Sequence, residues 1–351
     1  MTKNGMVTDG NIGYDATYIY YGNKGDSVSP IIIPNYTIPL GRTIKGVETT
    51  KRTDPITVDW SEASNIENII REFYGITDFK TLRFTNNVSK KMLLARDITN
   101  DRILKIIGGN NLMELANHYE IDRRDVDNIF SPRLFYDGPS RINLPAGIST
   151  LYMEDLGKHG NFCQNDNLRH ESLSKASACL DWLHSQGYSH GDVKSENFMG
   201  NGEEVRMIDF ETMSSNDRCI GFTVSWSSPQ VLRLYGLSYK QTIEGLSDDE
   251  VKELLQINDS FDGKANDVYS FGVLVQKVLY DNPELLTSRH VRDTEDTYRR
   301  LLSISENPHN VYVPVSEPRL KSLVESMLDL NPLNRPKMGE VYTNLNDIIG
   351  K

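Results

Sequence analysis

Residues 188–213 read YSHGDVKSENFMGNGEEVRMIDFETM, a stretch that places a carboxylate, a lysine, an amide and a second carboxylate close together. Asp192 and Asn197 lie five residues apart, and Asp209 follows the apolar run VRMI. The glycines of GNGEE, between Asn197 and that run, are typical of a turn. Because an amphipathic helix precedes Asp192, a helix, a loop and a hairpin would bring the three polar side chains to one edge of the fold.

The side chains gathered at this edge suit a particular chemistry. Asn197 and Asp209 offer hard oxygen ligands for Mg²⁺, an ion that usually keeps several waters and bridges to substrate phosphates. Asp192 could accept a proton from a hydroxyl nucleophile, and Lys194 could neutralise charge on a phosphoryl group during its transfer. This division of roles is that of phosphoryl transfer.

Two motifs carry a resemblance to a known family. The stretch HGDVKSEN, residues 190–197, resembles the catalytic loop of eukaryotic-like protein kinases, and IDFE, residues 208–211, resembles their metal-binding Asp-Phe-Gly. Further matches follow in the family's order. They are SACLDWLHSQGYSHGD for the helix that leads into the catalytic loop, TVSWSSPQ for the segment ending in Ala-Pro-Glu, DVYSFGVLVQKVLY for the buried central helix, and MLDLNPLNRPKM for the closing Arg-containing motif. The resemblance runs from about Thr81 to the C-terminus.

The resemblance implies an α+β, bilobal fold like that of protein kinases, with a small β-rich N-lobe and a larger helical C-lobe. We expect an N-terminal extension over residues 1–79, partly flexible and with a helix near 61–74. The N-lobe would then cover residues 80–155 and the C-lobe residues 156–351, with an insertion near 236–262.

Local patterns favour the same arrangement. Residues 60–74 place isoleucines at helical spacing, whereas KTLRFT, KKMLLARD and RILKII are typical of short strands in an antiparallel sheet. Residues 110–122 are predicted to be a helix, and TLYMEDL a strand that enters a connector. Ser247 and Glu250 have the spacing of a capping box, which predicts a helix that begins near Asp248.

Carried over to matching positions, the resemblance assigns roles to individual residues. Asp192 would be the catalytic base and Lys194 a phosphate contact. Asn197 and Asp209 would be the ligands of Mg²⁺. Lys105 in RILKII lies where the strand lysine of kinases grips the α- and β-phosphates of ATP.

The same comparison implies two structural contacts around these groups. Lys105 should pair with a carboxylate on the next helix, with Glu114 as the expected partner and Glu120 as the alternative. Asp267 would anchor the backbone of the catalytic loop.

The chain also departs from the family pattern at several positions. The stretch TNNVSKKM, residues 85–92, replaces the Gly-rich loop without a glycine, which predicts weak, Mg²⁺-dependent binding of ATP. Gly191 replaces the Arg before the catalytic Asp, which predicts activity that needs no phosphate on the activation loop. Glu211 replaces the Gly of Asp-Phe-Gly, and Gln230, expected to meet Arg335, replaces a Glu.

The predicted function is that of an ATP-dependent protein serine/threonine kinase, a phosphotransferase. The alternatives are a pseudokinase that serves as a binding or scaffolding module, and a small-molecule kinase. The retained set favours an active enzyme, because a scaffold has no physical need for all of Lys105, Asp192, Asn197 and Asp209. The segment TVSWSSPQ favours a protein substrate, since small-molecule kinases of the related families generally lack one like it.

The nature of the protein substrate can be narrowed in part. Lys194 and Thr223 would hydrogen-bond around Asp192 and keep the pocket shallow, which favours Ser and Thr over Tyr. The divergent loops and the polar N-terminal extension resemble bacterial or viral kinases that act on host proteins. A host protein is therefore an expected partner, and delivery into a host cell an expected route.

Composition argues against several other classes of protein. With 49 acidic and 38 basic residues the net charge is −11, so nucleic acid is not an expected partner. Three scattered cysteines argue against a disulfide framework or a Cys-rich metal site and favour a reducing compartment. No apolar run is long enough to span a bilayer, and the N-terminus lacks the pattern of a secretory signal. A soluble, cytoplasmic protein is expected.

Overall fold

The computed structural model divides into two compact units, Met1–Ile56 and Thr57–Lys351. In the first unit an antiparallel sheet has the strand order β1-β2-β3. Its strands, β1 at Gly5–Asp9, β2 at Ile12–Ile19 and β3 at Ile31–Pro34, are not among the elements predicted from the sequence. The structure describes residues 5–9, 12–19, 31–34, 59–86, 91–108, 112–135, 148–215, 219, 221–280, 296–306, 313–314 and 316–349.

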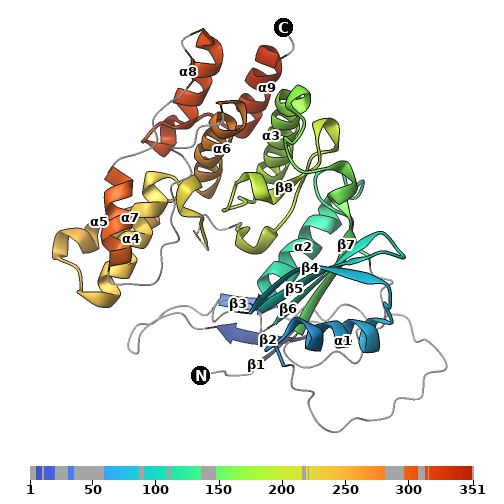
Figure 1. Cartoon of the computed structure of the whole chain (residues 1–351). Helices are drawn as coiled ribbons and strands as arrows, with labels where there is room; N and C mark the ends of the chain where they lie inside the picture. Colours follow the sequence, from blue (N-terminus) through green and yellow to red (C-terminus); the bar gives the residue numbers. More distant parts are fainter. Residues whose placement is uncertain are drawn as a thin grey trace. The chain divides into compact units, whose positions relative to one another are not determined.

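The N-terminal part of the second unit contains a four-stranded antiparallel sheet in the order β4-β5-β6-β7 (Figure 1). The four predicted strands are confirmed as β4 Phe79–Asn86, β5 Lys91–Asp97, β6 Arg102–Gly108 and β7 Ile148–Glu154. Between β5 and β6 the carboxylate of Asp97 accepts a hydrogen bond from the backbone N–H of Asn100 at 3.1 Å. The turn between the two strands is therefore closed by the side chain of Asp97.

Two helices, α1 (Ala63–Tyr74) and α2 (Leu112–Arg124), pack on opposite faces of this sheet. Side chains alternate along a strand, so Leu104 and Lys105 point to opposite faces of β6. Leu104 packs in a core cluster with Ile66 and Ile70 of α1. The neighbouring cluster contains residues of β6 and β7 together with Leu115 of α2. Lys105 therefore points to the face that α2 covers.

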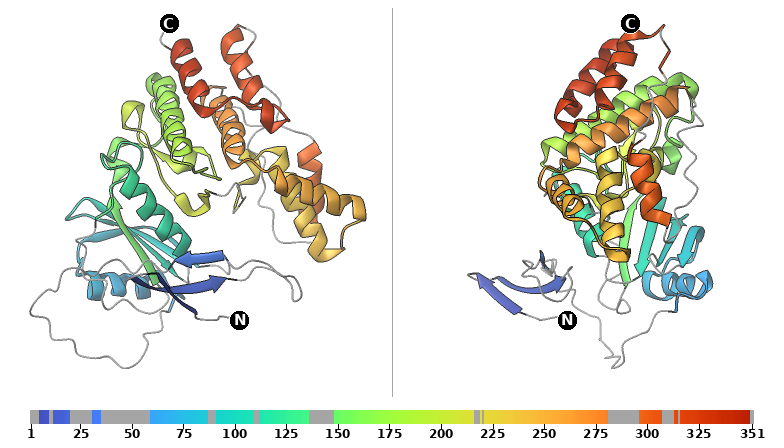
Figure 2. Two further views of the ribbon diagram at one scale, coloured as in Figure 1. Left: turned by 180° about the vertical axis from the view of Figure 1, so that it is seen from behind. Right: turned by 90° about the vertical axis from the view of Figure 1, so that its left-hand side faces the viewer.

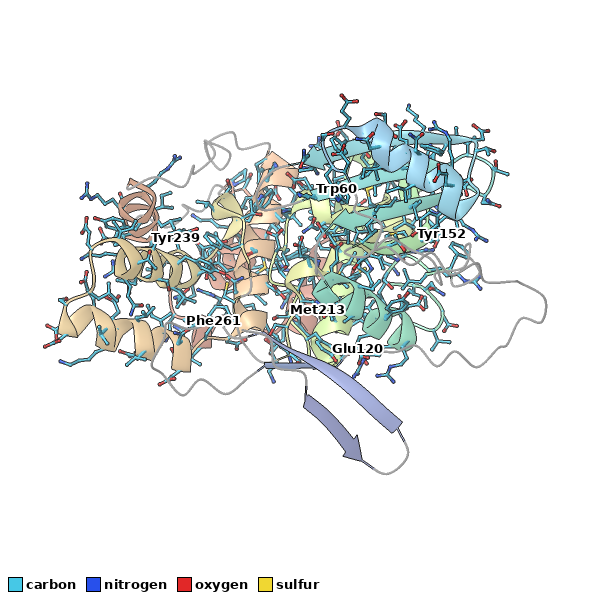
Figure 3. All side chains as sticks on the ribbon, turned by 90° about the horizontal axis from the view of Figure 1, so that it is seen from below. Trp60, Glu120, Tyr152, Met213, Tyr239 and Phe261 are labelled. Carbon is cyan, nitrogen blue, oxygen red and sulfur yellow. The ribbon has the colours of Figure 1, made fainter. Side chains whose placement is uncertain are left out.

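The N-terminal end of α1 is fixed on the sheet by an indole. Trp60, labelled in Figure 3, is 6% exposed and belongs to the same core cluster as Tyr152 of β7. A Cβ atom at Gly108, the last residue of β6, would lie 2.5 Å from the Trp60 ring. Glycine at the end of this strand therefore makes room for the indole.

The rest of the second unit is mainly helical and is built around α6 (Gly263–Tyr280), which buries residues on all its sides. This helix packs against α3 (Arg169–Ser185) and α8 (Pro318–Met327), and α3 also packs against α9 (Met338–Ile349), as Figure 2 shows. The predicted α+β fold, a β-rich part followed by a larger helical part, is confirmed. No helix in the ranges described is long and apolar enough to cross a lipid bilayer.

A short hairpin lies between α3 and the later helices. Its strands are β8 (Phe198–Met199) and β9 (Arg206–Met207), which pair antiparallel. The 3-10 turn η4 (Ser195–Asn197) precedes β8, and the 3-10 turn η6 (Phe210–Thr212) follows β9 closely. The hairpin predicted from residues 188–213 is thereby confirmed.

Helix α5 (Asp248–Asp259) lies inside the segment where the sequence predicts an insertion, and it follows α4 (Pro229–Ile243). The predicted capping box is present, because Ser247 Oγ accepts from the N–H of Glu250 and the Glu250 carboxylate accepts from the N–H of Ser247. None of the residues of α5 is buried. Apolar burial therefore contributes little to holding this helix in place.

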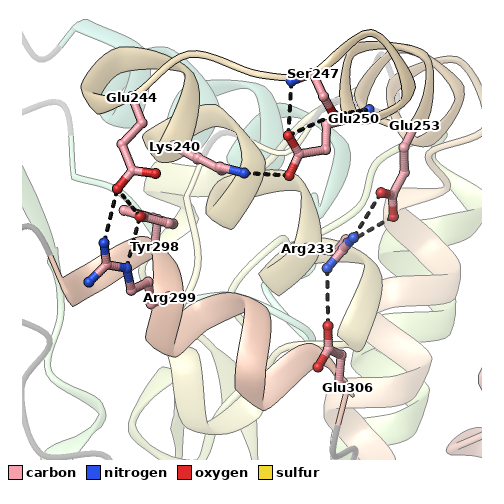
Figure 4. A network of polar contacts seen from close by, with 9 residues as sticks. All are labelled: Arg233, Lys240, Glu244, Ser247, Glu250, Glu253, Tyr298, Arg299 and Glu306. Atoms are coloured by element: carbon pink, nitrogen blue, oxygen red, sulfur yellow. Dashed lines mark hydrogen bonds and ion pairs between the residues drawn. The ribbon is translucent and has the colours of Figure 1, made fainter.

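Ion pairs attach α5 to its neighbours, as Figure 4 shows. The guanidinium of Arg233, on α4, lies 2.8 Å from both carboxylate oxygens of Glu253. It also reaches Glu306, on α7 (Asp296–Glu306), at 3.5 Å. Lys240 Nζ lies 2.6 Å from the carboxylate of Glu250. The position of α5 thus depends on charges that are partly exposed to solvent.

We expect Arg233→Gln to loosen α5 without unfolding the rest of the unit, because the change removes the bidentate pair with Glu253. An exposed pair contributes about 0–1 kcal/mol, but α5 has little apolar burial to replace it. Hydrogen–deuterium exchange over residues 248–259 should rise several-fold, and about 1 M NaCl should raise it in the unchanged protein. The control is Lys252→Gln, which breaks a contact with Asp249 inside α5 itself. Equal exchange in the two variants would show that packing holds α5.

Candidate active site

The loop after α3 is held by one buried carboxylate of the central helix. Asp267, on α6, is fully buried and accepts hydrogen bonds from the backbone N–H groups of His190 at 2.6 Å and Gly191 at 2.9 Å. Its Oδ2 also lies 3.0 Å from His184 Nε2. Asp267 thus stands where the sequence comparison expects the anchor of this loop.

Gly191 has a backbone reason to be glycine. Its φ is +81°, which L side chains rarely adopt, and a Cβ atom there would lie 2.7 Å from the backbone oxygen of Thr212. The resemblance to protein kinases described above identifies this position as one where the usual arginine is replaced. In this chain the loop geometry itself favours a residue without a side chain.

The carboxylate of Asp192 is held on both of its oxygens. Thr223 Oγ1 donates to Asp192 Oδ1 at 2.7 Å, and Lys194 Nζ contacts Asp192 Oδ2. The ammonium of Lys194 also donates to Thr223 Oγ1 at 3.0 Å, and the amide of Asn197 donates to the Asp192 backbone oxygen at 2.8 Å. Asp192 therefore has a defined orientation before any substrate arrives.

Asp209 is joined to this loop through the backbone. The N–H of Ile208 donates to the carbonyl of Asn197 at 2.9 Å, so the residues that flank the hairpin lie side by side. Asp209 itself has a left-handed backbone with φ 62°, an uncommon conformation for a residue other than glycine. Its Oδ1 lies 3.2 Å from Lys105 Nζ.

Lys105 of β6 joins the sheet to both the helix α2 and the hairpin. It is 8% exposed, and its ammonium contacts the fully buried carboxylate of Glu114 as well as Asp209. Burial lowers the pKa of Lys105, but the charges of Asp209 and Glu114 outweigh it and the net pKa shift is upward. Lys105 therefore stays a cation.

The structure separates the two carboxylates that the sequence leaves as alternatives. Glu114 faces Lys105, whereas Glu120 pairs with Arg123 at 2.9 Å and Arg124 at 2.6 Å. Both glutamates are on α2, but they lie six residues apart. Since a helix has 3.6 residues per turn, they project from different faces.

The aromatic residue after Asp209 is packed under α2. Phe210 is fully buried, and its ring lies 5.0 Å from the ring of His118 and 5.7 Å from that of His190. Burial and the nearby Lys105 lower the pKa of His118 to about 3, so its ring is neutral. His190 is buried and its Nε2 lies 3.2 Å from the Ile208 oxygen, so it has a structural role in holding this backbone.

The donor set around Asp209 fits a hard divalent cation. The Asn197 side chain uses Nδ2 toward Asp192, which turns its amide oxygen away from that residue. Oxygens of Glu114, Asp209 and Glu211 lie within 4.8 Å of one another. Carboxylate and amide oxygens are the ligands that Mg²⁺ prefers, and Asn197 and Asp209 would hold it.

Three polar contacts at this site were not predicted from the sequence. Asn117 Nδ2 donates to the backbone oxygens of Phe210 at 2.7 Å and Met213 at 3.3 Å. Thr212 Oγ1 donates to the His190 oxygen at 2.8 Å. Ser189 and Ser214 form an antiparallel bridge through N–H···O bonds of 2.9 and 3.1 Å. Only the spacing of Asn117, three residues after Glu114, could have drawn attention to it.

Two further expectations concern the closing motif and the glycine-free loop. Arg335 donates to Gln230 Oε1 at 2.8 Å and to the Ala265 oxygen at 3.1 Å, so the expected contact is present. Burial lowers the pKa of Arg335 to about 10. The middle of TNNVSKKM, residues 87–90, lies outside the described residues.

Comparison with known proteins agrees with the resemblance seen in the sequence motifs. A profile of the protein kinase domain matches residues 152–344. Among curated proteins, the chain is similar to "Dual specificity protein kinase shkD" of Dictyostelium discoideum, with 25% identity over 258 residues. The alignment covers 68% of this chain and 30% of that relative, so the chain spans less than a third of the relative's length.

We expect ATP to bind at least tenfold more weakly in EDTA than with Mg²⁺, as measured by calorimetry. The reason is electrostatic, because the single ammonium of Lys105 is already faced by the carboxylates of Glu114 and Asp209. A polyphosphate needs a further cation to approach them. Lys105→Met should weaken binding in both buffers, while the surface change Lys252→Met should leave it unaltered. Equally tight binding in EDTA would contradict this reading of the site.

Proposed function

The chain belongs to the protein kinase family, and we propose that it is an active protein serine/threonine kinase that uses ATP. The observation that carries the proposal is the pair of charge clusters joined by the Ile208–Asn197 hydrogen bond. One cluster is Lys105 with Glu114 and Asp209, and the other contains Asp192 and Lys194. A module that only binds another protein would have no need to bury Lys105 and Glu114 opposite Asp209.

Each residue has a role that follows from its contacts. Asp192 would accept the proton of the substrate hydroxyl, and Thr223 and Lys194 hold its carboxylate in place for that step. Lys194 would also neutralise charge on the phosphoryl group. Lys105 would bind the phosphates of ATP, with Glu114 fixing its ammonium.

Mg²⁺ bound by Asn197 and Asp209 would supply neutralisation of the phosphate charge. Asn197 serves a second purpose, since its amide donates to the Asp192 backbone oxygen and so ties the ligand to the base. The loop that contains Asp192 and Asn197 thereby sets the position of the proposed metal ligand relative to the proposed base. ATP and Mg²⁺ are the substrate and the metal ion of the proposal.

A protein substrate is supported by the segment TVSWSSPQ. Its 3-10 turn, Val224–Trp226, places Trp226 in the core, where Lys277 lies 4.5 Å over the indole ring. The backbone N–H of Ser228 donates to Asn266 of α6 at 3.3 Å. The segment, which begins at Thr223, is thus anchored and would support an extended polypeptide.

Serine and threonine are the proposed acceptors because Thr223 and Lys194 both crowd the Asp192 carboxylate. The curated relative is named a dual specificity kinase, so phosphotyrosine is the alternative result to look for. Action on a host protein stays a prediction from the sequence, and nothing in the described residues bears on it.

We predict that Asp192→Asn and Asp209→Ala each reduce phosphoryl transfer about a thousandfold or more. Each change removes a charge from the acceptor of the proton or from the metal site, worth several kcal/mol in the transition state. Transfer of label from ATP to a mixed protein substrate, followed by phosphoamino-acid analysis, tests both the activity and the Ser/Thr preference. Asp249→Asn, on α5 with its side chain 94% exposed, is the control. Full activity in either active-site variant would remove the basis of the proposal.

We further predict that phosphatase-treated protein keeps its rate. The start of the segment after Asp209 is held by neutral contacts, including the Thr212 hydroxyl on the His190 oxygen. Replacing Thr212 by Ala would remove that hydrogen bond as well as a phosphorylation site, so phosphatase treatment checked by mass spectrometry is the cleaner test. A tenfold fall in rate on dephosphorylation, about 1.4 kcal/mol in barrier, would show that a phosphate switch exists.

A further inference from the structure

We propose that Asn117 is a positioning residue that locks the turn after Asp209 to helix α2 in the active arrangement. Its amide does by neutral hydrogen bonds what a phosphate and an arginine would do by charge. The inference rests on the proposed kinase function and names how that same site is kept ordered. Asn117 touches no reacting group itself.

The clamp joins one side chain to both ends of a single turn. Asn117 Nδ2 donates to the Phe210 oxygen at 2.7 Å and to the Met213 oxygen at 3.3 Å. The N–H of Met213 also donates to the Phe210 oxygen at 3.2 Å, which closes the turn. An amide nitrogen with two hydrogens can satisfy both carbonyls at once.

The position of Asn117 on α2 couples this turn to the lysine pair. Glu114 and Asn117 are three residues apart, so they project from one side of the helix. Glu114 contacts Lys105, and Lys105 also contacts Asp209, the residue directly before the turn. Holding the turn against α2 therefore fixes where Asp209 stands relative to Glu114.

The backbone conformation of Asp209 is one that such a clamp would help to hold. Its left-handed backbone, φ 62°, is costly for a residue with a side chain and persists only when its surroundings hold it. Phe210 packs edge-on against His118, also on α2, at 5.0 Å between ring centroids. Apolar packing determines how deeply the Phe210 ring is buried against α2. The two directed hydrogen bonds of Asn117 determine which residues of the turn lie opposite it.

The geometry of the loop disfavours the alternative in which an arginine at position 191 orders the segment by binding a phosphate. At Gly191 the φ of +81° and the 2.7 Å approach of a Cβ atom to the Thr212 oxygen leave no unstrained place for an arginine. Thr212 instead donates its hydroxyl to the His190 oxygen. Neutral groups thus order this part of the segment from two directions.

Four variants separate the donor chemistry from simple packing. Asn117→Asp keeps the shape but directs a carboxylate oxygen at two carbonyls, Asn117→Ala removes the group, and Asn117→Gln keeps the donor on a longer side chain. Arg123→Gln is the matched control, because Arg123 is on the same helix with its side chain 67% exposed and paired with Glu120. Activity would be assayed well below the melting temperature of each variant.

Two readouts are measured on the full chain: kcat and KM for ATP, and hydrogen–deuterium exchange of peptides covering residues 209–215. We expect Asn117→Ala to lower kcat at least tenfold and to raise exchange over this segment. Asn117→Asp should do more, Asn117→Gln should recover part of both, and Arg123→Gln should change neither. A residue that only stabilised the fold would lower the melting temperature and leave kcat at the assay temperature unchanged.

The two proposals fail in different ways. Unaltered exchange and kcat in Asn117→Ala, with a folded protein, would overturn the clamp and leave the kinase function standing. Absence of transfer by the unchanged protein would overturn the kinase function, while exchange would still decide whether Asn117 holds the turn. Should Asn117→Asp not fold, Asn117→Ala decides by the same two readouts.

Discussion

The pairing of Lys105 is the interaction on which the site depends. A buried ammonium is costly unless it is paired, and this one is satisfied by Glu114 from α2 and by Asp209 from the end of the hairpin. One charge thereby ties together a sheet, a helix and a hairpin that are far apart in the chain. Removing the fully buried Glu114 would leave the ammonium with Asp209 alone, a partner at 3.2 Å that is partly exposed to solvent. The ion pairs that hold the sheet, the helix and the hairpin together therefore also place the charged groups that the chemistry needs.

The second constraint is one of backbone geometry. Asp267 accepts two backbone N–H groups from the loop, and Gly191, the second donor, takes a φ of +81°. With a Cβ excluded by the Thr212 oxygen, residue 191 cannot add a second cationic side chain to the one that Lys194 places beside the base. The substitution of glycine for arginine is thus coupled to the path of the following segment. What looks in sequence like one lost side chain is a different way of packing two loops together.

Local signals predicted much of this structure. The strands, the hairpin and the capping box of α5 depend on residues close in sequence, and their patterns were sufficient. Local patterns were not sufficient to choose between Glu114 and Glu120, because that choice depends on which face of α2 meets the sheet. Asn117 was missed for the same reason, since its partners lie over ninety residues away. The sheet of β1, β2 and β3 was missed although β2, IGYDATYI, alternates apolar and polar residues and β3, IIIP, is apolar. The sequence around these short strands is rich in Gly, Asn, Asp and Ser, which favours an irregular segment.

Helix α2 is the element through which these constraints combine. Glu114, Asn117 and His118 project from it toward Lys105, the turn and Phe210, while Leu115 packs in the cluster under the sheet. A small displacement of α2 would break an ion pair and two hydrogen bonds at once, and directed bonds lose their strength over a few tenths of an ångström to an ångström. The apolar contacts on its other side would change far less over that distance. The active arrangement is therefore specified by its polar contacts and only supported by its apolar ones.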